Sequence, residues 1–124
     1  MQLPDLNSAQ IGVVGLGYVG LPLAFELAGR YAVIGFDINA RRVGELQRGC
    51  DRTREVPASW FEDDSKRPQF TATPEELAAC SIFIVTVPTP IDAHRVPDLG
   101  PLRSASRPVG QGLKPGAVVI YEST

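Results

Sequence analysis

The stretch that decides the fold runs from Ile11 to Asp37 and reads IGVVGLGYVGLPLAFELAGRYAVIGFD. Its opening apolar run, Ile11–Val14, leads directly into glycines, which is typical of a buried parallel strand entering a tight turn. An apolar helical segment follows. Pro22 falls early in it, where a missing amide hydrogen costs little, and Gly29 is expected to close it in the left-handed conformation. Val33–Phe36 gives a second strand, so the stretch predicts one strand–helix–strand unit.

The glycines of this unit have the spacing of a dinucleotide-binding turn. Gly15 makes the turn, Gly17 lets the backbone approach a pyrophosphate, and Gly20 lets the helix lie close to the sheet. The helix, expected to begin near Tyr18, directs unpaired amides and the positive end of its dipole at the phosphates. A purely structural turn is the alternative, because turns use glycine for their own reasons. The strand before the glycines and the helix after them favour the dinucleotide site.

Asp37 ends the second strand, twenty positions after Gly17. A carboxylate placed there accepts hydrogen bonds from the two hydroxyls of an adenine ribose, and its charge repels a 2′-phosphate. NAD is therefore favoured over NADP, with Arg41 and Arg42 nearby as the residues that keep NADP an alternative.

Length and composition limit the functional classes. The 124 residues, 44% hydrophobic and with a net charge of -2 and a pI near 5.3, predict one globular domain without electrostatic attraction to nucleic acid or membranes. Arginines at 41, 42, 48, 52 and 54 alternate with acids and predict a solvated helix face. Residues 1–5 lack the basic start and apolar stretch of a signal peptide, so none is expected, and the sequence shows neither an apolar run of membrane-spanning length nor cysteines at metal-ligand spacing. We expect a cytoplasmic protein without a metal.

The rest of the chain predicts alternating helices and strands. Asn39 caps a helix at 40–48 that Gly49 ends, and residues 50–67 form a surface excursion. The other expected elements are a strand at 69–71, a brief helix opened by Thr73, a strand at 82–87, a helix at 101–113 with a kink or break near Pro108, and a strand at 117–121. Right-handed crossovers then give a doubly wound α/β fold of the Rossmann type, with a mainly parallel sheet in the order 3-2-1-4-5 and helices on both faces.

Several separated motifs resemble the N-terminal domain of the nucleotide-sugar 6-dehydrogenases, the UDP-glucose/GDP-mannose dehydrogenase family. They are VVGLGYVGLPLA at 13–24, GFDIN at 35–39, VTVPTPID at 85–92, PDL at 97–99 and YEST at 121–124. The segment GCDRTRE at 49–55 is similar to the branch that acts on UDP-N-acetylglucosamine or UDP-N-acetylgalactosamine in Vi polysaccharide and O-antigen biosynthesis.

The resemblance implies oxidation of a UDP-sugar C6 alcohol to a carboxylate with two NAD. In that family a cysteine thiolate captures the intermediate aldehyde as a thiohemiacetal, the second NAD oxidises this adduct to a thioester, and water hydrolyses the thioester to the acid. The nucleophile comes from chain beyond the equivalent of Thr124, and neither Cys50 nor Cys80 matches it; Cys80 is expected to be inert packing. We therefore expect residues 1–124 to be an NAD-binding fragment, inactive alone, of an enzyme that is a homodimer or larger.

The resemblance also assigns roles to single residues. The pyrophosphate is lined by Gly15, Gly17, Tyr18, Val19 and Gly20, the adenine ribose by Asp37, and the adenosine edge by Arg42. The nicotinamide side is bordered by Val87, Pro88 and Thr89, and Thr124 matches a threonine that orders the catalytic water beside the cofactor. A strand-end hydroxyl bonded to the backbone is the alternative for Thr124. A stand-alone NAD-binding or redox-sensing module, and a different dehydrogenase of this fold, remain alternative functions.

Overall fold

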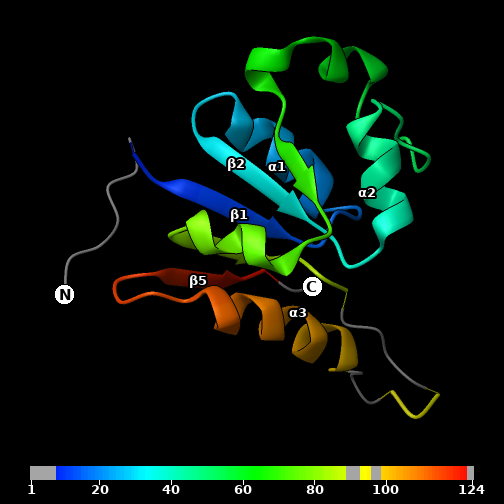
Figure 1. Ribbon diagram of the computed structural model, residues 1–124. Helices are drawn as coiled ribbons and strands as arrows, with labels where there is room; N and C mark the ends of the chain where they lie inside the picture. Colours follow the sequence, from blue (N-terminus) through cyan, green and yellow to red (C-terminus); the bar gives the residue numbers. More distant parts are fainter. Residues whose placement is uncertain (1–7, 89–92, 96–98, 123–124) are drawn as a thin grey trace.

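Five parallel strands form one sheet in the spatial order β3-β2-β1-β4-β5 (Figure 1). The structure is a computed structural model and describes residues 8–88, 93–95 and 99–122. The strands are β1 (Gln10–Val14), β2 (Ala32–Phe36), β3 (Gln69–Thr71), β4 (Ile82–Val85) and β5 (Val118–Tyr121). The predicted fold class and strand order are confirmed.

The α-helices of the described part are α1 (Gly20–Ala28), α2 (Ala40–Gln47) and α3 (Gly100–Gly112). Three short helices are of the tighter 3-10 type: η1 (Ala58–Glu62), η2 (Asp64–Lys66) and η3 (Pro74–Ala79). The Asn39 side chain accepts a hydrogen bond from the amide of Arg42 and so caps α2, as predicted. None of the described helices is long and apolar enough to cross a bilayer.

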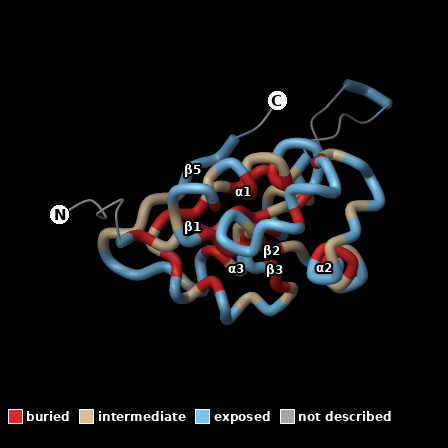
Figure 2. Tube along the Cα trace, turned by 90° about the horizontal axis from the view of Figure 1, so that it is seen from above, coloured by how far each residue is buried: buried red, intermediate tan, exposed pale blue. Residues whose placement is uncertain are grey.

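Helices cover both faces of the sheet, which explains why its strands are continuous apolar runs. Successive residues of β1 point to opposite faces: Val13 packs with Ala24 of α1, and Val14 packs with Phe83 and with Val109 of α3. Figure 2 shows the buried residues along the central strands and the inner sides of the helices. Because β1 pairs in parallel with both β2 and β4, the carboxyl ends of these three strands lie at the same edge of the sheet.

Two predictions about loops were wrong. Gly29 does follow the last residue of α1, as predicted, but it has φ −66°, a right-handed conformation, because Arg30 and Tyr31 both donate to the carbonyl of Leu27 and continue the turn. The segment 50–67 is more than a surface excursion, since Val56 and Phe61 are buried. The Phe61 ring packs edge-on against Phe25 of α1, with the ring centroids 5.0 Å apart. This segment therefore closes the core beside α1 and α2.

Three further predictions, about a helix break, a helix cap and a strand end, differ from the structure. The helix α3 continues through Pro108, so the predicted break does not occur there, and Ala105 and Val109 on either side of the proline are both buried. Thr73 precedes η3 as expected but makes no side-chain capping bond. The strand β4 stops at Val85, two residues before its predicted end, and Thr86 and Val87 instead approach the glycine turn.

Candidate functional site

The turn after β1 requires glycine at its first position. Gly15 has φ +100°, a left-handed conformation that other residues rarely adopt, and its amide donates to the carbonyl of Phe36 at 2.8 Å. A Cβ atom there would lie 2.9 Å from Cγ1 of Val87. The turn is therefore held between the end of β2 and the segment after β4.

The start of α1 lies directly against this turn. A Cβ atom at Gly20 would lie 2.8 Å from the carbonyl carbon of Gly15 and closer still to its oxygen. The hydroxyl of Thr86 donates to the carbonyls of Gly15 at 2.8 Å and Val14 at 3.2 Å. Tyr18 and Val19 form a turn and α1 begins at Gly20, within one helical turn of the start predicted near Tyr18. Sequence reasoning missed Thr86, although a threonine directly after an apolar strand was a visible signal.

Gly17, the middle glycine of the motif, leaves the space beside the turn open. A Cβ atom at Gly17 would meet no atom within 4 Å. Within the described residues, the amides of Gly17, Tyr18 and Val19 make no hydrogen bond, and the carbonyl of Gly17 accepts from Leu21 at 3.2 Å to start the helix. Unpaired amides at the positive end of a nine-residue helix are the donors that a pyrophosphate needs. The loop therefore fits a dinucleotide.

Asp37 lies beside the glycine turn, as predicted. Its Oδ2 accepts from the amide of Leu16 at 3.0 Å, and its Oδ1 accepts from the amide of Asn39 at 2.9 Å. The amide of Asp37 donates to the carbonyl of Thr71 in β3 at 3.2 Å. Each carboxylate oxygen still has a lone pair for a further donor. The carboxylate is thus fixed at the end of β2 with capacity left for a ribose hydroxyl.

Arg42 does not lie on a solvated helix face, so that prediction was wrong for this residue. Its side chain is only 13% exposed, and its guanidinium donates to the carbonyl of Leu16 at 3.2 and 2.9 Å. It also donates to Asp51 at 2.8 Å and to the hydroxyl of Thr53 at 3.2 Å. Buried carbonyl and carboxylate acceptors explain why this arginine turns inward. Arg41 is exposed on α2 beside Glu45, whereas Arg52 and Arg54 follow α2 rather than lie on it, and Arg52 pairs with Glu45.

The segment after β4 lies beside the turn, where the nicotinamide side was predicted. Val87 is half-buried next to Gly15, and Pro88 is exposed. The amide of Glu122 donates to the carbonyl of Val85 at 2.9 Å, so the end of β5 adjoins the end of β4. Thr89 and Thr124 lie outside the described residues.

The other candidate residues fit structural roles. Cys80 is buried, and burial raises the pKa of its thiol to about 11, so it stays protonated at neutral pH, in line with inert packing. Cys50 is exposed. Within the described part of the chain, no group of three or more His, Cys, Asp or Glu residues could hold a metal ion.

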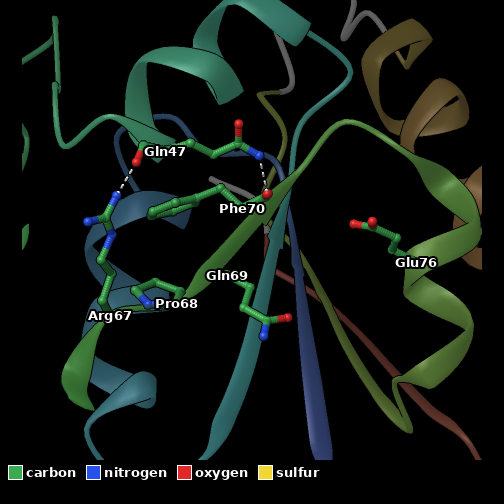
Figure 3. A pocket seen from close by; sticks show the side chains of 6 residues that line it. All are labelled: Gln47, Arg67, Pro68, Gln69, Phe70 and Glu76. Atoms are coloured by element: carbon green, nitrogen blue, oxygen red, sulfur yellow. Dashed lines mark hydrogen bonds between the residues drawn. The ribbon is translucent and has the colours of Figure 1, made fainter. Parts of the chain in front are cut away.

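A hollow lies at the β3 edge of the sheet, away from the glycine turn (Figure 3). The side-chain amide of Gln47 donates to the carbonyl of Phe70 at 2.8 Å, and the guanidinium of Arg67 donates to the carbonyls of Leu46 and Gln47. The Gln47 bond joins α2 to β3 and satisfies one carbonyl of this edge strand, and the Arg67 bonds join the segment before β3 to the end of α2. None of the residues lining this hollow belongs to the glycine turn. It therefore has a structural explanation.

Comparison with known proteins supports the interpretation of the glycine turn as a dinucleotide site. The family described as "UDP-glucose/GDP-mannose dehydrogenase family, NAD binding domain" matches residues 9–124. The chain is 51% identical over 119 residues to UDP-N-acetyl-D-glucosamine 6-dehydrogenase of Pseudomonas aeruginosa. This match covers 96% of this chain and 28% of the relative. The chain is 42% identical to the Salmonella typhi enzyme of the same name, with the same coverage.

A solved structure of the UDP-D-ManNAc dehydrogenase from Pyrococcus horikoshii superimposes with a TM-score of 0.83 at 32% identity. The match covers 93% of this chain and 28% of that one. The chain thus spans between a quarter and a third of the length of the relatives that it matches. It belongs to the UDP-glucose/GDP-mannose dehydrogenase family and corresponds to the NAD-binding domain of that family.

Proposed function

We propose that residues 1–124 hold NAD for an enzyme that oxidises the C6 alcohol of a UDP-N-acetylhexosamine, or of UDP-glucose, to a carboxylate. The observation that carries this proposal is the 51% identity to a UDP-N-acetyl-D-glucosamine 6-dehydrogenase over 96% of the chain. We place the enzyme in the cytoplasm, as a homodimer or larger assembly, in the biosynthesis of a surface polysaccharide. The alternatives are a non-catalytic NAD-binding module and a dehydrogenase of another type.

The chain's own residues would bind and orient the cofactor. The open amides of Gly17, Tyr18 and Val19 would donate to the pyrophosphate, and Asp37 would accept from the adenine ribose. Val87 and Pro88 would border the nicotinamide, which supplies hydride acceptance when NAD is bound. Thr89 at that border, and Thr124 as the residue that orders water, stay predictions from the resemblance.

The arrangement of Arg42 supports NAD over NADP. An arginine near the ribose would favour NADP if its guanidinium were free for a 2′-phosphate. Here that guanidinium already bonds the Leu16 carbonyl and the Asp51 carboxylate. Asp37 adds a negative charge where the 2′-phosphate would lie. Arg41, whose side chain is 76% exposed, is the remaining cation nearby.

Calorimetry with NAD, NADH and NADP tests the cofactor, and turnover by the full natural protein tests the substrate. We expect NAD to bind more tightly than NADP, because Asp37 repels the extra phosphate. With UDP-N-acetylglucosamine, UDP-N-acetylgalactosamine and UDP-glucose offered separately, we expect two NADH per sugar oxidised. Absence of NAD binding at millimolar concentration, or a preference for NADP, would refute the cofactor assignment. Binding without turnover on any of these sugars would favour the alternatives.

A further inference from the structure

The carboxylate of Asp51 is the centre of a hydrogen-bonded cluster outside the glycine turn. Asp51 lies after the end of α2, next to Cys50, and its side chain is only 3% exposed. Its Oδ1 accepts from the guanidinium of Arg42 at 2.8 Å and from the amide and hydroxyl of Thr53 at 3.1 and 2.8 Å. Its Oδ2 accepts from the amides of Glu55 at 2.6 Å and Val56 at 3.1 Å. One buried carboxylate thus satisfies five donors.

Arg42 connects this cluster to the glycine turn. Two nitrogens of its guanidinium, Nε and Nη2, donate to the carbonyl of Leu16, at 3.2 and 2.9 Å. On the other side of the same residue, the amide of Leu16 donates to Asp37. Leu16 stands between Gly15 and Gly17, and its side chain is buried. Both peptide groups of Leu16 are therefore held by charged side chains.

Because the peptide bond is planar, the hydrogen bonds that hold the Leu16 carbonyl also fix the direction of the Gly17 amide. The carbonyl of Leu16 and the amide of Gly17 belong to one planar trans peptide, so the two groups point in opposite directions. With the carbonyl fixed on Arg42, the Gly17 amide must point away from α2. That is the direction in which the amide finds no partner among the described residues. The orientation of this donor thus depends on where the Arg42 guanidinium sits.

We propose that Asp51 is a positioning residue of the cofactor site, which holds Arg42 on the Leu16 carbonyl and so directs the Gly17 amide at the pyrophosphate. The inference rests on the proposed NAD binding. Burial alone would raise the pKa of Asp51, but the bonds from Arg42, Thr53, Val56 and Glu55 outweigh it and keep the pKa below its usual value. The carboxylate is therefore charged at neutral pH. Arg42 thus has a charged partner in a largely buried place.

Asp51→Asn in the full natural protein tests this link, because asparagine keeps the size and one acceptor oxygen but removes the charge. We expect the dissociation constants of NAD and ADP, which contain the pyrophosphate, to rise roughly tenfold, the size expected when one charge-assisted hydrogen bond is weakened. Binding of adenosine, followed by ligand-observed NMR, should weaken clearly less, because adenosine lacks the pyrophosphate that the Gly17 amide would meet. A merely structural role of Asp51 would not separate these ligands.

Asp63→Asn is the matched control. Asp63 also closes a turn, with Oδ1 accepting from the amide and hydroxyl of Ser65 at 3.1 and 2.6 Å, and none of its bonds within the described residues reaches the glycine turn. We expect this variant to bind all three ligands like the wild type.

Each outcome decides between the claims. Unchanged NAD affinity in Asp51→Asn, or an equal loss for adenosine, overturns the positioning role while leaving the proposed NAD binding intact. Failure of the wild type to bind NAD refutes the proposed function instead. If Asp51→Asn does not fold, Thr53→Ala carries the same test, because the Thr53 hydroxyl accepts from Arg42 at 3.2 Å and donates to Asp51 at 2.8 Å, and its removal loosens the hold on Arg42. The same selective loss for NAD and ADP is expected.

Discussion

Replacing Gly20 with alanine is expected to destabilise the fold by about 2–3 kcal/mol, at the upper end of what overpacking a tight contact costs. The added Cβ would lie 2.8 Å from the carbonyl carbon of Gly15 and closer still to its oxygen. These are backbone atoms, so either the turn or the start of α1 must shift. Alanine's better helix propensity recovers at most about 1 kcal/mol, so the clash decides the sign. Urea unfolding of the wild type and variant measures the difference.

Gly29→Ala, at the opposite end of the same helix, is the control for Gly20→Ala. Gly29 has φ −66°, and a Cβ atom there would lie 3.6 Å from the carbonyl oxygen of Glu26, an ordinary contact. This variant should be as stable as the wild type or more stable by about 0.5–1 kcal/mol, since alanine restricts the unfolded chain. Equal stability of Gly20→Ala and the wild type would mean that α1 does not abut the turn as described.

Replacing Gly17 with alanine is expected to have the opposite profile, with stability retained and NAD binding lost. A Cβ atom at this position meets no protein atom within 4 Å, and Gly17 is not among the glycines with positive φ. The methyl group would instead occupy the space in which the pyrophosphate approaches the backbone. Loss of one hydrogen bond to a charged group corresponds to about 1.5–3 kcal/mol, or roughly 10- to 100-fold in the dissociation constant. Calorimetry with NAD measures the loss.

Gly110→Ala in α3 is the matched control for Gly17→Ala. Its Cβ atom would also meet nothing within 4 Å, but it lies far along the chain in a helix with no part in the proposed site. We expect its NAD affinity to equal that of the wild type. Wild-type affinity in Gly17→Ala would show that the glycine turn does not receive the pyrophosphate.

The sheet could be predicted because its signals are local. The apolar runs around Val13, Val33 and Phe83 each specify a buried strand, and the glycine turn joins the first two. Once those strands are parallel, right-handed crossovers leave few possible orders. The placement of Asp37 beside the turn follows from the same short segment. For this reason the core of the site could be read from about thirty residues.

The interactions around Arg42 could not be predicted in this way. The arginine joins Leu16 to Asp51 and Thr53, and its sequence neighbours look like an ordinary solvated helix face. Which way a long side chain turns depends on acceptors brought in by distant segments, here a buried carboxylate and a turn carbonyl. The burial of Val56 and Phe61 was missed for the same reason, since the aromatic partner Phe25 belongs to another helix.

The measurement that tests the central claim most directly is a titration of the isotope-labelled protein with NAD, followed through its amide proton–nitrogen correlations. The open amides of Gly17, Tyr18 and Val19 should show the largest shifts, together with those of Leu16 in the glycine turn and of Asp37 at the end of β2. Those shifts would place the pyrophosphate and ribose where the geometry accommodates them. Shifts confined to the hollow around Gln47, Gln69 and Glu76, with the glycine turn unchanged, would contradict the account.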